Sequence, residues 1–170
     1  ASSSSQKSIE QSRAVIEQEL GAIAWKIHEK EYLLEQNLHN RELIKTGLIM
    51  IDEGVVKFIH PSFQTYFIGV HLANLYLGEW VNRGIVNHLF FEFNERKSPL
   101  FYEVSIVKMF TGYLHNKKMH YNLQIFFEHL LKEAADYSIR LELIAPIYQE
   151  CSNFVDDYQN FVSQCVYCIS

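Results

Sequence analysis

One short segment with the pattern of a β-hairpin separates stretches of helical periodicity, and it limits the folds open to this chain. Residues 48–51 and 55–59 are apolar and rich in β-branched side chains, and a turn with a glycine, Asp52-Glu53-Gly54, lies between them. No other part of the sequence has a good hairpin pattern. The chain is therefore predicted to contain a single two-stranded ribbon.

Two helices are predicted before this ribbon. Apolar residues recur at steps of three, four and seven residues, which place side chains on one face of a helix. They are Ile9, Ile16, Leu20, Ile23, Ala24 and Ile27. Gly21 inside this pattern suggests close packing against a neighbour. A second, shorter helix is predicted over residues 40–45 and stops at Gly47.

The chain after the ribbon is predicted to be a series of helices with short connections. Pro61 and Ser98-Pro99 have the residue types that begin helices. Further helical segments are predicted over residues 121–133, 141–150 and 154–166. Successive short helices of this kind are typical of stacked helical hairpins.

The predicted fold class is mainly α, with a winged-helix-like module that contains one β-hairpin, followed by a helical, repeat-like array. Two helices followed by a two-stranded ribbon is the element order of winged-helix domains. Residues 1–7, with their serine run, are predicted to be a disordered lead-in. The module covers residues 8–60, and the helical array covers residues 61–170.

Composition and charge exclude several classes of protein. With 48% hydrophobic residues, 21% charged residues and only 3 Pro, the chain is typical of a compact domain. The 20 acidic residues outnumber the 15 Lys and Arg, so the basic excess of nucleic-acid binders is missing. No segment reaches the roughly 18 uninterrupted apolar residues of a membrane span, so neither nucleic acid nor a membrane is an expected partner.

Metal and enzyme motifs are missing from the sequence. The 3 Cys are Cys151, Cys165 and Cys168, an odd number that favours a reducing, cytoplasmic location. A structural zinc site needs four ligands, which these residues do not supply. Neither a nucleophile elbow nor a Gly-rich phosphate loop occurs. We therefore expect no metal, no cofactor and no catalysis in this chain.

The run from Val56 to Phe67 carries a family resemblance. It reads Val-Lys-Phe-Ile-His-Pro-Ser-Phe-Gln-Thr-Tyr-Phe and follows Leu-Ile-Lys-Thr-Gly-Leu-Ile over residues 43–49. It resembles the segment after the nucleotide-binding core of NACHT-type NTPases, of the signal-transduction ATPase class. There, Phe-Ile-His-x-Ser/Thr-Phe-Gln-Glu-Tyr/Phe-Phe closes a winged-helix domain and opens the next helix. Two weaker likenesses, Leu20–Trp25 and Tyr102–Leu114, occur in the same order.

The chain departs from the family pattern at two places. Thr65 replaces the usual Glu, and Ile68-Gly69 replaces a common Ala-Ala pair. The missing phosphate loop implies that the chain is a fragment or relic without the ATPase core. The resemblance thus implies ATP or ADP in a parent protein, whose upstream nucleotide-binding domain is one partner of this segment. A protein partner or a neighbouring protomer is the other.

The resemblance gives His60 a role. In these NTPases the His at this place reaches the phosphates of bound ADP, which implies a nucleotide-state sensor in the parent protein. The alternative is a histidine that caps the helix at Pro61 or hydrogen-bonds within the hairpin. The residues expected to support the hinge between module and array are Pro61, Phe63, Gln64, Tyr66 and Phe67. Of these, Phe63 and Phe67 are expected to anchor the two parts to each other.

Two other functions stay open at this point. The chain could be a free-standing helical scaffold that captures a peptide or helix in an aromatic groove. The expected groove residues are Phe90, Phe91, Phe93 and Tyr102. A winged-helix module could also bind DNA, but Arg41, Lys45 and Lys57 supply little positive charge for a DNA groove.

Overall fold

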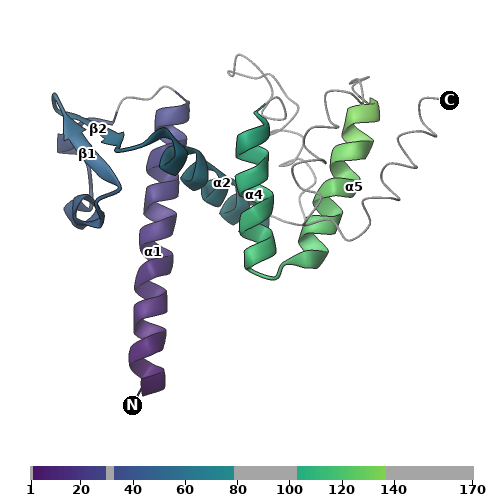
Figure 1. Ribbon diagram of the computed structural model, residues 1–170, viewed down its shortest axis with the longest axis horizontal. Coiled ribbons are helices and arrows are strands. Elements are labelled where there is room, and N and C mark those ends of the chain that lie inside the picture. Colours follow the sequence, from purple (N-terminus) through teal and green to yellow (C-terminus); the bar gives the residue numbers. More distant parts are fainter. Residues whose placement is uncertain (1, 30–32, 79–102, 137–170) are drawn as a thin grey trace. The chain divides into compact units, whose positions relative to one another are not determined.

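The computed structural model describes residues 2–29, 33–78 and 103–136 (Figure 1). These residues fall into two compact units, one that ends at Asn74 and one that begins at Leu75. The elements, in chain order, are α1 (Ser2–His28), η1 (Glu35–Asn37), η2 (Arg41–Thr46), β1 (Ile49–Asp52), β2 (Val55–Phe58), α2 (Pro61–Gly78), α4 (Val104–Asn116) and α5 (His120–Asp136). The predicted mainly α fold with one antiparallel hairpin is confirmed.

The hairpin forms where the sequence predicts it. Strands β1 and β2 pair antiparallel, with Asp52 opposite Val55 next to the turn. The turn residues Glu53 and Gly54 have φ values of 50° and 76°, the left-handed pair that a tight two-residue hairpin turn requires. A third extended segment joins the other edge of β2, because Val56 donates its N–H to the Leu33 carbonyl over 2.9 Å. The sequence did not predict this segment.

The short helix before the hairpin lies in the expected place as a 3₁₀ helix, η2. The side chain of Asn40 accepts the N–H of Glu42 at its start, and Gly47, with φ 75°, ends it in the left-handed conformation. At six residues it is longer than most 3₁₀ helices, which rarely exceed about four residues. Asn40 also donates its Nδ2 to Glu19 Oε2 over 2.8 Å, which ties η2 to α1.

Helix α1 is longer than the sequence predicts. It begins at Ser2, so it covers the described part of the segment expected to be disordered. A helix that is already nucleated adds each further residue without a new nucleus, so serines of middling propensity can continue it. Its expected apolar face is only partly buried: Leu20 and Ile23 are buried, but every residue from Ser4 to Val15 is exposed, including Ile9 at 54%.

The two long helices of the first unit meet at Gly21. A Cβ at Gly21 would lie 3.2 Å from the Cβ of His71 and 3.2 Å from the Phe67 carbonyl oxygen. One turn further along α1, the Trp25 ring stacks on the His71 ring, with 5.6 Å between centroids. The close packing that the sequence predicts at Gly21 is therefore confirmed, and the neighbour is α2.

The second unit is built around the α4–α5 hairpin. The rings of Phe110 and Phe126 meet edge to face at 4.7 Å, and Tyr76 lies against both. The Tyr76 hydroxyl donates to the Asn122 carbonyl over 2.9 Å, and burial raises the pKa of Tyr76 to about 12. Phe110 and Phe126 are fully buried in this cluster, as are Leu114 of α4 and Leu130 of α5.

The division between the two compact units lies after Asn74, inside α2. The expected boundary between module and array at about residue 60 stays a prediction. The first turns of α2 pack against α1 and the hairpin, so they belong to the first unit. The helices predicted over residues 141–150 and 154–166, and the start at Ser98-Pro99, lie outside the described residues.

A side chain at Gly21 should destabilise the protein. Gly21→Val places branched atoms against the His71 Cβ and the Phe67 carbonyl, so we expect a loss of about 1–3 kcal/mol in the free energy of unfolding. The matched control is Gly78→Ala at the end of α2, where no atom lies within 4 Å of the added Cβ. Chemical denaturation of both variants measures the difference. Equal stability of the Gly21→Val variant and the wild type would contradict the close packing of α1 against α2 at Gly21.

Candidate functional site

The candidate site is the junction between β2 and α2. The hairpin ends where Ile59 donates its N–H to the Leu48 carbonyl over 3.0 Å. His60 follows, and its carbonyl accepts the N–H of Phe63 over 3.1 Å, the first hydrogen bond of α2. His60 is thus the N-cap residue, and Pro61 takes the first helical position, where its missing N–H is not needed.

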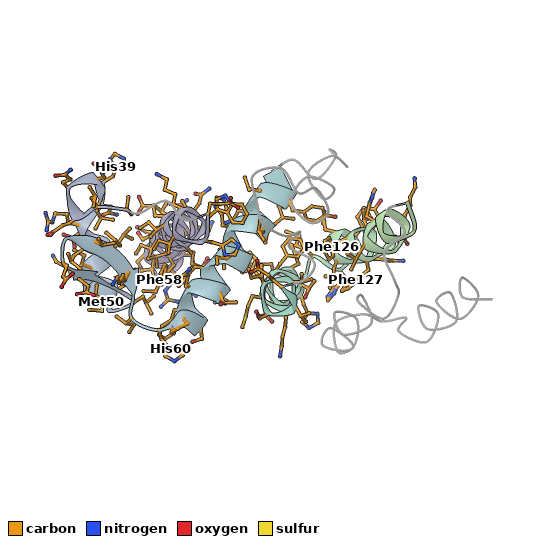
Figure 2. All side chains as sticks on the ribbon, turned by 90° about the horizontal axis from the view of Figure 1, so that it is seen from above. His39, Met50, Phe58, His60, Phe126 and Phe127 are labelled. Carbon is orange, nitrogen blue, oxygen red and sulfur yellow. The ribbon has the colours of Figure 1, made fainter. Side chains whose placement is uncertain are left out.

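The His60 ring bonds to the helix that it begins. Its Nδ1 accepts the N–H of Ser62 over 3.1 Å and lies 2.7 Å from the Ser62 Oγ. The side chain is exposed, and Figure 2 shows it at the start of α2, pointing away from the ribbon. The capping role, one of the two alternatives from the sequence, is therefore confirmed. The cap leaves the second ring nitrogen on the exposed side.

Of the two expected anchors, only Phe67 is buried. It is 5% exposed and stacks on Phe58 of β2, with 5.9 Å between ring centroids, so it joins α2 to the hairpin. Tyr66 contacts it edge to face at 5.0 Å. Phe63 is 37% exposed, and its ring meets the His60 ring in a T-shaped contact, with centroids 6.2 Å apart. Of the two rings, Phe67 is thus the one that stacks on the hairpin, while the anchoring role of Phe63 stays a prediction.

The two polar residues after Phe63 differ in their contacts. Gln64 is half-buried, and no hydrogen bond of its side chain occurs within the described residues. Thr65, which stands where the resembling family has Glu, donates its hydroxyl to the Pro61 carbonyl over 3.1 Å. The position therefore stabilises the first turn of α2 without a carboxylate.

His71 was not among the predicted site residues, yet it lies at the crossing of α1 and α2 that holds the site. Burial lowers the pKa of His71. Burial, with a smaller contribution from the charge of Glu17, raises the pKa of Tyr66, which lies five residues earlier in α2. The only hint in the sequence is the spacing of four residues from Phe67, which puts both on one face of α2.

Several predicted residues cannot be placed. Phe90, Phe91, Phe93 and Tyr102 lie outside the described residues, as do the three cysteines. Over residues 2–29, 33–78 and 103–136, no group of three or more His, Cys, Asp or Glu side chains could hold a metal ion. No helix in this part of the chain is long and apolar enough to cross a membrane.

Comparisons of the chain with protein-family models, with curated proteins and with solved structures found no match. The NACHT resemblance therefore depends on the sequence segments described above, of which the run from Val56 to Phe67 is the most specific.

The contrast between Phe67 and Phe63 predicts unequal effects of truncation. Phe67→Ala removes a buried ring that stacks on Phe58, so we expect it to lower the free energy of unfolding by about 3–5 kcal/mol. Phe63→Ala, four residues away on the same helix, should change it by about 0.5 kcal/mol. Urea denaturation measures both. A larger loss in Phe63→Ala than in Phe67→Ala would contradict the assignment of the anchor.

The lowered pKa of His71 predicts destabilisation by acid. In the pH interval between its folded and unfolded pKa values, the unfolded chain binds more protons than the folded one. The contribution of His71 to the free energy of unfolding is therefore complete above its unfolded pKa of about 6.5. This contribution is lost as the pH falls through the folded pKa. His71→Phe keeps a ring against Trp25 and should flatten this pH dependence.

Thermal unfolding of His71→Phe across mildly acidic pH checks the prediction. The control is His39→Gln, at an exposed histidine of the same unit, which should retain the acid destabilisation of the wild type. If the His71→Phe variant loses as much stability in acid as the wild type, His71 is not the source of the acid destabilisation.

Proposed function

We propose that this chain is the non-catalytic regulatory and coupling segment of a NACHT-like signalling NTPase. In this proposal, His60 contacts the nucleotide bound by an upstream domain of the same parent chain, and α2 passes the nucleotide state to the helices after it. The observation that carries the proposal is the exposed imidazole of His60, which is hydrogen-bonded to the first turn of α2.

The chemistry of the His60 ring suits such a contact. An imidazole N–H can donate to a phosphate oxygen, and such a bond to an anion is stronger than one between neutral groups. The ring contacts Phe63, which is 37% exposed, and the preceding residue, Ile59, is also apolar and 50% exposed. This setting supports a contact with another domain, which would be released when the domains swing apart.

Helix α2 supports the coupling part of the proposal. It runs without interruption from Pro61 to Gly78. Its buried residues Phe67 and Val70 belong to the first unit, while Tyr76 belongs to the second. Closely packed cores tend to switch between arrangements rather than deform smoothly, so a displacement at the start of α2 would affect residues in both units.

A free-standing protein-binding scaffold is the second candidate. It is favoured by exposed large apolar side chains on and beside the hairpin, namely Leu34, Met50 and Ile59. Met50 lies on the outer side of β1, since its neighbour Ile49 is buried (Figure 2). These side chains fit a protein contact under either proposal, so they do not separate the two. The nucleotide experiment below does.

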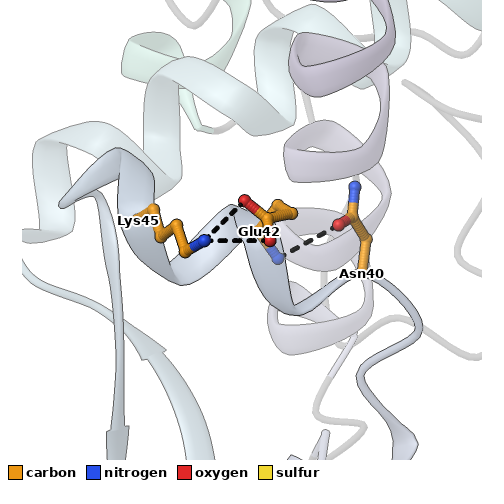
Figure 3. Close-up of polar contacts among 3 residues, drawn as sticks. All are labelled: Asn40, Glu42 and Lys45. Atoms are coloured by element: carbon orange, nitrogen blue, oxygen red, sulfur yellow. Dashed lines mark hydrogen bonds and ion pairs between the residues drawn. The ribbon is translucent and has the colours of Figure 1, made fainter.

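The weaker alternative, DNA binding, has little support from the described cations. Lys45 pairs with Glu42 at 3.0 Å (Figure 3), Arg41 pairs with Glu35 at 2.6 Å and Lys57 pairs with Asp52 at 2.9 Å. Each of the three cations that could face a DNA groove thus has an acidic partner beside it. Retention on heparin at physiological salt would favour this alternative.

The test of the proposed function uses the parent protein, with the segment that precedes this chain. We expect the purified parent to retain ADP and the His60→Ala variant to release it about ten- to a hundredfold faster, since a charge-assisted hydrogen bond contributes about 1.5–3 kcal/mol. Nucleotide content after gel filtration and the rate of ADP exchange measure this effect.

The matched control is His39→Ala, at an exposed histidine of the same unit, which should leave the ADP exchange rate unchanged. A preceding segment without a phosphate loop, or equal ADP retention in His60→Ala and wild type, would refute the nucleotide role and favour the scaffold.

A further inference from the structure

The hydrogen bonds of His60 define which ring nitrogen carries the proton. Ser62 donates its backbone N–H to His60 Nδ1 over 3.1 Å. A backbone N–H can only donate, so Nδ1 must present its lone pair. The Ser62 hydroxyl, 2.7 Å from the same nitrogen, must then donate as well. One residue therefore directs two donors at one side of the ring.

The proton of the neutral ring must then lie on Nε2. A neutral imidazole carries one N–H, and the hydrogen bond at one nitrogen determines the tautomer. The Phe63 ring lies against the His60 ring in a T-shaped contact, at a 76° interplanar angle, and this contact further restricts the rotation of the imidazole. His60 is exposed, so the Nε2 side of the ring presents a donor to its surroundings.

We propose that Ser62 is a positioning residue that holds His60 in the Nε2–H tautomer with this N–H directed outward. This choice of tautomer also defines the chemistry of the ligand, an inference that rests on the proposed function. An outward N–H fits an acceptor such as a phosphate oxygen. A transition-metal ion needs a ring lone pair, and in this tautomer the only lone pair is already used by Ser62.

The same ring links the ligand to α2. When Nε2–H donates to an anion, electron density at Nδ1 rises, and hydrogen bonds in such a chain strengthen one another. Contact with a phosphate therefore strengthens the N-cap of α2. By thermodynamic reciprocity, an intact cap favours contact with the phosphate to the same degree. Ser62 is the residue through which these two events are coupled.

The experiment uses the 170-residue chain labelled with ¹⁵N at histidine. Two-bond ¹H–¹⁵N correlation spectra, recorded at a pH where the ring is neutral, distinguish the protonated ring nitrogen from the unprotonated one. We expect a protonated Nε2 and an unprotonated Nδ1 for wild-type His60. In Ser62→Ala, which keeps the backbone donor but loses the hydroxyl, the two ¹⁵N shifts should move toward each other. Ser62→Thr, which restores the hydroxyl, should regain the wild-type signature.

Controls separate positioning from folding. Ser12→Ala removes a serine whose hydroxyl bonds the Ser8 carbonyl in the exposed part of α1, and it should leave the His60 shifts unchanged. Far-ultraviolet circular dichroism should show the same helix content in every variant. A wild-type His60 protonated at Nδ1, or identical His60 shifts in Ser62→Ala and wild type, would overturn the proposal.

A second measurement distinguishes this inference from the proposed function. In the parent protein, Ser62→Ala should weaken ADP retention by about two- to five-fold, the range expected when one hydrogen bond no longer preorganises the ring. Unchanged ADP retention together with the expected NMR signature would overturn the ligand assignment and leave the positioning role supported. Weaker ADP retention in Ser62→Ala, together with His60 shifts identical to those of the wild type, would overturn the positioning role alone.

Discussion

The close crossing of α1 over α2 is the contact on which the first unit depends. The absence of a side chain at Gly21 lets the backbone of one helix approach the other, and the stack of Trp25 on His71 then covers the contact. Helix α2 is thereby fixed in position. Phe67 of this helix then stacks on Phe58 and so attaches the hairpin to α2. The location of His60 follows, since it lies between that hairpin and the first turn of α2.

Much of this arrangement is visible in the sequence, because it depends on local rules. The Glu53-Gly54 turn, the glycine after η2 and Pro61 all depend on backbone preferences of single residues, and each lies where it was predicted. The extended segment at Leu33 was not predictable, because it consists of a few residues held by backbone hydrogen bonds to β2. Such pairing leaves no periodic pattern of side chains.

The candidate site was predictable in part for the same reason. Helical spacing places Phe63 and Phe67 on one face of α2 but does not show how far the hairpin reaches along that face, so the sequence could not tell the buried ring from the exposed one. For His60, the sequence offered a helix cap and a ligand contact as alternatives. The geometry makes them compatible, because the cap uses Nδ1 and leaves Nε2 on the outer side.

The exposed first half of α1 has a consequence for local stability. A helical segment whose side chains touch little else depends on its own propensity, and short segments of this kind are marginal in water. The turns between Ser4 and Val15 should therefore open far more often than the turn at Leu20, which lies in the core. Amide hydrogen exchange along α1 should accordingly slow by orders of magnitude from one end to the other within a single continuous helix.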